Sequence, residues 1–391
     1  MIRKTIALGL GVTALTPLAA YAQQSLLLDE ITATASLVPI EINRTGTTVE
    51  TLDATDIAQG GLSIGQTLAL LPGVSITTNG GLGATSTLRL RGLGGGYIGV
   101  RIDGIDMTDP SDPQTAFNFG TLTAGLPDRI ELLKGSQSAL YGANAIAGVV
   151  DITTWRPDAP GFSGRANVEA GSFGTAVATL NLGQKGARGE VALTVSRLTT
   201  DGFSARTSDD EKDGFDQTQL ILSAAYDATE DLRLGFSALY SDGTSEFDWS
   251  TTDPSGEADQ TRRGLRSFAE FTTGAIEHEL ALSWVETERV YRGGITGHFV
   301  GERTRLDYLG RVDLSADLTL AFGANWTEEK AKLDGERHDS AAAFGELQYA
   351  VSPALDLALS LRHDSYSDFD DQLSGRAALA WRMRDDVILR A

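Results

Sequence analysis

The chain has 391 residues, a formal net charge of −21 and no cysteine. The acidic balance excludes a protein that binds nucleic acid through a basic face, because phosphate binding requires clustered positive charge. The absence of cysteine excludes disulfides and thiolate metal sites. The 44 glycines and the scarcity of long apolar runs favour many short strands over a helical protein.

Residues 1–22 have the pattern of an export signal. Arg3 and Lys4 give a basic start, an apolar stretch follows at 6–15, and Ala-Tyr-Ala at 20–22 is a small-x-small cleavage site. The apolar stretch is too short to cross a bilayer as a helix. We therefore expect cleavage before Gln23 and export.

Residues 39–156 predict one small α+β domain. We expect short helices that begin near Asp53 and Ser63, and strands separated by glycine-rich turns at 49–52, 74–76, 88–91, 100–102, 129–133 and 148–153. The glycines at 94–99 match a dinucleotide fingerprint in form only, because a strand follows them instead of a helix. No catalytic constellation emerges from the four histidines, so we predict no enzyme.

Residues 160–391 alternate between apolar and polar side chains. Leu232, Leu234 and Phe236, for example, alternate with polar or small residues, which is typical of a strand with one lipid-facing side. Similar runs of roughly ten residues, the length of a tilted membrane-spanning strand, begin near 162, 175, 189, 215, 231, 262, 277, 304, 318, 340, 354, 373 and 386. Short connections alternate with long polar ones, which we place at 201–214, 241–261, 289–303 and 331–339. This parity favours a transmembrane β-barrel over a soluble β-sandwich.

Several segments resemble one known family. The segments 71–75 (Leu-Pro-Gly-Val-Ser), 90–92 (Leu-Arg-Gly), 102–104 (Ile-Asp-Gly) and 128–154 resemble, in this order, plug-domain signatures of TonB-dependent outer-membrane receptors. The resemblance implies a small α+β plug domain inside an antiparallel transmembrane β-barrel, in the outer membrane of a Gram-negative bacterium and in contact with its lipid. Plugged transporters have about 22 strands, and about 12–13 are predicted here, so we expect a barrel truncated at its C-terminus.

Residues 23–38 are polar and small, and their composition predicts a flexible segment. Within it, 29–35 resembles the TonB box of the family. The resemblance implies that these residues bind a TonB-type energy-transducing protein, and an extended chain could do so by adding as a strand to the partner's sheet. A disordered amino terminus is the alternative. The residues of the box are Asp29, Glu30, Ile31, Thr32, Ala33, Thr34 and Ala35.

The cargo is predicted by a narrower resemblance. The segments 71–81, 142–150 and 240–248 are most similar to the vitamin B12 receptors of the family, which implies cobalamin or a related corrinoid. An iron siderophore or haem is one alternative, and a truncated fragment that does not transport is another. By their position at the apex of the plug, the candidate substrate contacts are Thr78, Asn79, Gly80 and Tyr97. Flexible turns are the competing interpretation of these residues.

The same resemblance implies a structural calcium ion, held in those receptors by aspartates of two extracellular loops. The matching positions here are Asp209, Asp210 and Asp213 in one loop and Asp242 and Asp248 in the next. Calcium prefers about 6–8 hard oxygen ligands, and two loops that share an ion become crosslinked. Glu211 and Lys212 depart from the spacing of the family, and a solvated acidic loop is the alternative.

Overall fold

The computed structural model describes residues 31–32, 34–206, 210–249, 256–293, 296–333, 335–384 and 387–391. The predicted export signal at 1–22 and four candidate site residues, Asp29, Glu30, Ala33 and Asp209, lie outside these ranges. Among the described residues, no helix is long and apolar enough to cross a bilayer.

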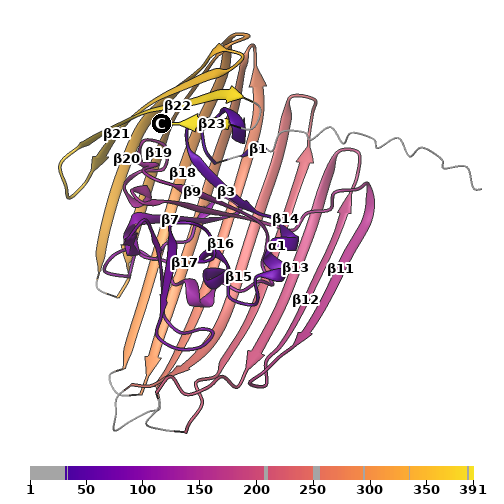
Figure 1. Cartoon of the computed structure of the whole chain (residues 1–391), viewed down its shortest axis with the longest axis vertical. Coiled ribbons are helices and arrows are strands. Elements are labelled where there is room, and N and C mark those ends of the chain that lie inside the picture. Colours follow the sequence, from indigo (N-terminus) through magenta and orange to yellow (C-terminus); the bar gives the residue numbers. More distant parts are fainter. Residues whose placement is uncertain are drawn as a thin grey trace, which may run out of the picture.

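The larger part of the molecule is a 13-stranded antiparallel sheet in which every strand pairs with its neighbours in the chain. It forms a curved wall around the smaller domain (Figure 1). Most of the strand starts predicted from the alternation of side chains are confirmed to within a few residues, but β16 and β18 begin six and seven residues before the predicted 262 and 304. The strands are β11 (Gly161–Ala170), β12 (Ala176–Lys185), β13 (Gly189–Thr200), β14 (Phe215–Asp227), β15 (Leu232–Phe247), β16 (Gly256–Thr273), β17 (Ile276–Arg292), β18 (Gly297–Ser315), β19 (Leu318–Ala331), β20 (Glu336–Ser352), β21 (Leu355–Tyr366), β22 (Gln372–Arg384) and β23 (Val387–Arg390).

Three of the predicted long loops are wrong in their extent. Within these segments the described residues 241–247, 256–261, 289–292, 297–303, 331 and 336–339 are strand, because β15 to β20 continue past the apolar alternation as paired ribbons. The β15–β16 ladder, for example, runs without interruption from Leu232↔Phe271 to Phe247↔Gly256. Backbone pairing needs no apolar side chains, so the strands extend beyond the part that a bilayer requires.

The smaller domain, the plug, contains a five-stranded sheet in the order β3-β9-β10-β7-β8 and a three-stranded sheet in the order β4-β5-β6. In the first sheet, β10 and β7 are parallel and the other pairs are antiparallel. Its strands are β3 (Thr48–Leu52), β7 (Ile98–Ile102), β8 (Ile105–Asp106), β9 (Pro127–Lys134) and β10 (Gly148–Thr154); those of the second are β4 (Val74–Thr78), β5 (Ser86–Leu90) and β6 (Leu93–Gly94).

Short helices connect the plug strands. They are α1 (Ala54–Gln59), α2 (Ile64–Leu68), α3 (Ser138–Tyr141) and the 3₁₀ turns η1 (Ile42–Arg44), η2 (Gly95–Tyr97), η3 (Phe119–Thr121) and η4 (Ala143–Ala145). The predicted start at Asp53 is confirmed, because its side chain accepts hydrogen bonds from the backbone N–H of Thr55 and Asp56 in a capping box. The start of α1 is thus specified by the local sequence.

The largest apolar cluster of the plug reaches the wall. Ile130, Leu132 and Val150 are among the fully buried side chains of the central sheet, and Leu239 and Val285 of the wall belong to the same cluster. Gly264 of β16 leaves room for the plug, since a Cβ there would lie 3.3 Å from the Ile105 Cδ1. The wall and plug therefore share buried apolar surface on the concave side of the sheet.

Charged contacts between plug and wall join acids of one part to arginines of the other. Arg289 Nε lies 2.9 Å from Asp109 Oδ2, Arg303 Nη1 lies 3.0 Å from Asp106 Oδ1, and Arg44 Nη2 lies 2.9 Å from Asp356 Oδ1. The wall thus supplies the first two arginines, and η1 of the plug supplies the third.

Candidate functional site

A cavity of about 790 Å³, here called the apex cavity, lies between the plug and the inner face of the wall. The loops 79–87 and 109–121 supply its plug side, and strands β14 to β17 supply its wall side. Polar and aromatic side chains line it, among them Asn79, Gln114, Gln217, Arg262, Arg289 and Tyr291. The alternation of the wall strands points Gln217, Arg262 and Arg289 inward, where they face the plug instead of lipid.

A close approach at Gly83 fixes the plug side of the apex cavity. Gly83 has φ of +81°, and a Cβ on this residue would lie 2.2 Å from Phe215 Cδ2 of the wall. A left-handed backbone in contact with an aromatic ring requires glycine. The loop therefore packs directly against the first residue of β14.

The four candidate substrate contacts are not all brought together. Asn79 lines the apex cavity. Thr78 accepts a hydrogen bond from Ser86 Oγ at 3.2 Å, and Gly80 faces Ala205 of the wall loop 201–214. Tyr97 does not line the cavity. It is the last residue of η2 and is 49% exposed.

Arg262 and Arg289 are site residues that the sequence reasoning did not select. Both fall at the edge of segments predicted as loops, where neither apolar alternation nor a motif marks an inward side chain. The register of the wall sets them on adjacent strands, with Gln260 opposite Arg289 and Arg262 opposite Thr287. A prediction of the long ribbons would have been needed to find Arg289.

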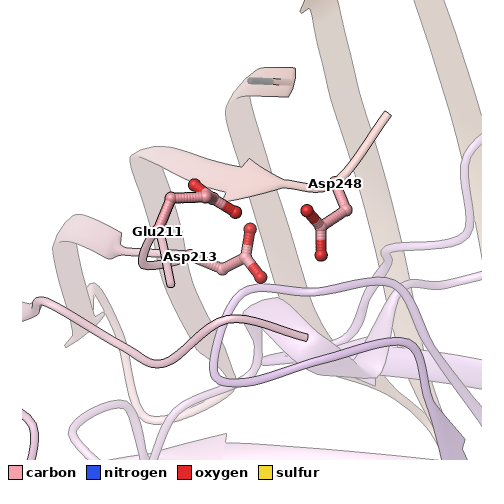
Figure 2. A group of neighbouring side chains, drawn as sticks. All are labelled: Glu211, Asp213 and Asp248. Atoms are coloured by element: carbon pink, nitrogen blue, oxygen red, sulfur yellow. The ribbon is translucent and has the colours of Figure 1, made fainter. Parts of the chain in front are cut away.

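Three carboxylates gather at the rim of the apex cavity. Glu211, Asp213 and Asp248 each offer an oxygen within 4.8 Å of the others, and Figure 2 shows the three side chains pointing toward one another. The Glu246 N–H donates to the Gly214 carbonyl at 2.9 Å, and the Gly214 N–H donates to Glu246 Oε2 at 2.8 Å. These bonds extend the β14–β15 ladder and bring residues 210–214 beside the end of β15. This carboxylate cluster therefore joins two loops that are distant in sequence.

The surroundings of the carboxylate cluster suit a cation. The side chain of Asp248 is only 4% exposed, and neither of its oxygens accepts a hydrogen bond within the described part of the chain. The nearest positive group is Arg206, whose Nε is 3.8 Å away. A buried carboxylate with so little compensation is costly, and hard oxygen donors are the ligands that Ca²⁺ prefers.

Two of the predicted calcium ligands lie elsewhere. Asp242 is exposed on the face of β15 opposite the cavity-lining residues Ser241 and Gly243. It accepts a hydrogen bond of 2.8 Å from Thr261 Oγ1. Asp210 is exposed and does not join the carboxylate cluster. Glu211, which departs from the spacing of the family, takes their place beside Asp213 and Asp248.

The described part of the predicted TonB box is docked, so the expectation of a flexible segment is wrong for these residues. Ile31 and Thr32 form β1, which pairs antiparallel with β2 (Ile40–Glu41). Thr32 and Thr34 are buried, and both donate to Glu131 Oε2 of β9, at 2.6 and 2.5 Å. Tyr141 OH donates to the Thr34 carbonyl at 2.8 Å. The segment therefore lies against the plug, at the end of the wall where the short turns lie (Figure 1).

Two family models match the chain in succession. The model described as TonB-dependent Receptor Plug Domain matches residues 41–149, and that described as TonB dependent receptor-like, beta-barrel matches residues 154–391. The chain belongs to the TonB-dependent receptors. Its plug and its antiparallel wall are thus those of an outer-membrane receptor family.

Curated relatives of the receptor include vitamin B12 transporters named BtuB. That of Photobacterium profundum is 26% identical over 84% of this chain and 55% of its own length, and that of Vibrio cholerae is 24% identical over 96% and 64%. The receptor chain thus spans a little more than half the length of the curated relatives it matches.

Solved structures with the same fold include siderophore receptors. A mutant of the ferric enterobactin receptor PfeA from Pseudomonas aeruginosa superposes with a TM-score of 0.73 at 17% identity, covering 92% of this chain and 62% of its own. The siderophore receptor PirA from Acinetobacter baumannii gives 0.72 at 15% identity, covering 86% and 59%. At this identity the likeness concerns the fold alone.

The plug of the receptor also contains a half-buried acid that the sequence reasoning did not single out. Asp151 of β10 lies opposite Arg101 of β7 in the parallel pair. Burial raises the pKa of Asp151 to about 6, although the guanidinium of Arg101 opposes this shift. The centre of the plug thus contains a carboxyl group that changes its charge at mildly acidic pH.

Proposed function

We propose that the chain is the plug and part of the wall of a receptor that imports cobalamin or a related corrinoid across the outer membrane. The observation that carries this proposal is the apex cavity, which lies on the side of the plug remote from the docked box. Its volume of about 790 Å³ falls in the usual range for ligand sites of about 300–1,000 Å³. The curated relatives named as vitamin B12 transporters support the choice of cargo.

The chemistry of the apex cavity suits a ligand that carries many amides. Asn79, Gln217 and Gln260 line it and offer both donors and acceptors. A corrin ring bears peripheral amides that such groups bind. None of the four histidines lines this cavity, which disfavours haem held by histidine ligation. A ferric siderophore is the remaining alternative cargo.

Calcium at Glu211, Asp213 and Asp248 would serve the same site. The ion would crosslink the loop 201–214 to the β15–β16 ribbon, and both border the apex cavity, with Ala205 and Asp248 among its lining residues. We propose that the ion orders this rim and neutralises Asp248, and that it takes no part in chemistry.

The docked box would be the site of energy coupling. A partner that binds residues 29–35 must compete with β2, Glu131 and Tyr141 for the same backbone and hydroxyl groups. We propose that a TonB-type protein takes up this segment as an added strand once it leaves the plug. The force would then be transmitted to β9, which carries Glu131.

The test is uptake of labelled cyanocobalamin by cells that carry or lack the gene of the intact receptor. The proposal expects uptake that depends on the receptor and is lost when residues 29–35 are deleted. Uptake of labelled ferric siderophore in its place would move the cargo to iron. If the receptor is present in the outer membrane and supports uptake of neither compound, the result would favour the alternative of a chain that does not transport.

A further inference from the structure

Three arginines are buried among the described residues, and all three lie on the inner face of the wall: Arg262, Arg303 and Arg362. Arg303 pairs with Asp106 at 3.0 Å and with Glu329, and Arg362 pairs with Asp364 at 2.7 Å. Arg262, which is 6% exposed, has no carboxylate within ion-pair distance in the described part of the chain. It is therefore the one of the three whose charge has no contacting counterion there.

The contacts of Arg262 hold its guanidinium in place without neutralising it. Its Nη1 donates to Thr121 Oγ1 at 2.8 Å, and its Cζ lies 4.6 Å from the centre of the Phe117 ring. Its buried Nε has no hydrogen-bond partner within the described residues. A guanidinium that is buried and incompletely paired is costly unless a ligand completes it.

Asp109, the neighbouring acid, does not form an ion pair with Arg262. Asp109 is engaged by Arg289 Nε at 2.9 Å and accepts hydrogen bonds from the Ser111 N–H and hydroxyl at 2.8 and 2.7 Å. Its charge still attracts Arg262, but from beyond contact distance. Arg262, Thr121, Phe117 and Asp109 all line the apex cavity.

We infer that Arg262 binds an anionic oxygen group of the cargo. The inference rests on the proposed import function and specifies which part of the ligand the wall recognises. In a corrinoid with a complete nucleotide loop, the matching group is the phosphodiester; in a ferric chelate, it is a catecholate or carboxylate oxygen. A planar guanidinium fixed by an aromatic ring and a hydroxyl presents its remaining N–H groups to such an oxyanion in a set orientation.

The test compares two corrinoids on the intact receptor purified from outer membranes. Cyanocobalamin carries the phosphodiester, and dicyanocobinamide keeps the amide-bearing ring but lacks the nucleotide loop. We expect Arg262→Gln to weaken cyanocobalamin binding about 10- to 100-fold, the usual effect of losing a charge-assisted hydrogen bond, and to leave cobinamide affinity within about 2-fold. Arg262→Lys keeps the charge and should recover part of the lost affinity. If the glutamine variant does not fold, the lysine variant provides the test in its place.

Arg263→Gln is the matched control. Arg263 is the next residue of β16, lies on the opposite face and pairs with Glu286 at 2.6 Å. The Arg263→Gln variant should bind cyanocobalamin and dicyanocobinamide with unchanged affinity.

The two proposals fail in different ways. Equal losses of both corrinoids in Arg262→Gln, or no loss of either, would overturn the role of Arg262 and leave the corrinoid cargo standing. A folded wild-type receptor that binds no corrinoid but binds an anionic ferric siderophore would exclude a corrinoid as the cargo. In that case, loss of siderophore binding in Arg262→Gln, but not in Arg263→Gln, would still support the oxyanion role, and unchanged siderophore binding would overturn it.

Discussion

Thr32 donates a hydrogen bond of 2.6 Å to Glu131, and this contact joins the predicted TonB box to a central strand of the plug. Thr34 donates to the same carboxylate oxygen. A single acidic residue on β9 thus holds two side chains of the segment that an energy-transducing partner would have to remove.

Replacing Glu131 by alanine should release the box. Loss of two hydrogen bonds to a charged group is expected to raise the exposure of the segment about 10-fold or more. The chain has no cysteine, so a single Ala35→Cys, at a box residue that is 2% exposed, reports the release by its rate of thiol labelling.

Glu50→Gln provides the control for this experiment. Glu50 lies on the neighbouring strand β3 and pairs with Lys134 at 2.9 Å instead of with the box. Glu50→Gln should leave the labelling rate unchanged. Equal labelling rates in Glu131→Ala and in the parent, or an equal rise in both variants, would contradict the role of Glu131.

Calcium affinity should depend on Asp248 and not on Asp242. Asp248→Asn removes a buried charge from the carboxylate cluster and should weaken Ca²⁺ binding by about 10-fold or more, since ligand charge strongly tunes calcium affinity. Asp242→Asn changes an exposed residue on the other face of β15 and should have no effect. Calorimetric titration of both receptors with Ca²⁺ measures the difference, and the reverse order of effects would contradict the assignment.

Much of the wall could be predicted from the sequence, because a side chain every second residue must face lipid. Leu234, Phe236 and Tyr240 carry this signal, and the strand starts follow from it. The signal ends near Ser241, where both faces of the ribbon are polar, while the backbone pairing continues to Phe247 and Gly256. The long ribbons, and with them Arg289, could not be found by periodicity. The alternation placed Arg262 at the start of a predicted strand but did not mark its side chain as part of a site.

The candidate site could be predicted only in part, because it depends on pairings between distant segments. Asp213 and Asp248 were selected by resemblance, but the side of β15 on which Asp242 lies is set by its register with β14 and β16. Glu131 gave no sequence signal at all, since nothing in its own strand indicates that residues 32 and 34 lie against it.

Loss of Arg303 should loosen the plug. Arg303→Gln leaves Asp106 and the Thr108 carbonyl without their partner, and breaking a buried ion pair costs about 3–5 kcal/mol. The plug should therefore unfold at lower urea, as measured by thiol labelling of a buried plug position such as Ile130→Cys. Arg305→Gln is the control, because Arg305 pairs with Asp307 of its own strand at 2.8 Å. Matching urea midpoints for the two variants would argue against Arg303 as a plug contact.

The stability of the plug should fall as the pH rises from about 4 to about 6. The pKa of Asp151 is raised by burial from 3.8 to about 6, so the folded plug binds this proton more tightly than the unfolded chain does. Its stabilising effect is complete below the unfolded pKa and is lost as the pH rises through the folded pKa, by about 1–3 kcal/mol. Hydrogen exchange of the β10 amides, corrected for intrinsic rates, should show this slope, and Asp151→Asn should flatten it. Equal slopes in both receptors would speak against Asp151 as the titrating group.

Equilibrium binding of cyanocobalamin to the intact, purified receptor tests the central claim most directly. We predict saturable binding at one site, abolished by a bulky substitution at Gly83 that displaces Phe215 and closes the apex cavity. A folded receptor that binds no corrinoid, while it binds a ferric siderophore in the same assay, would contradict the account.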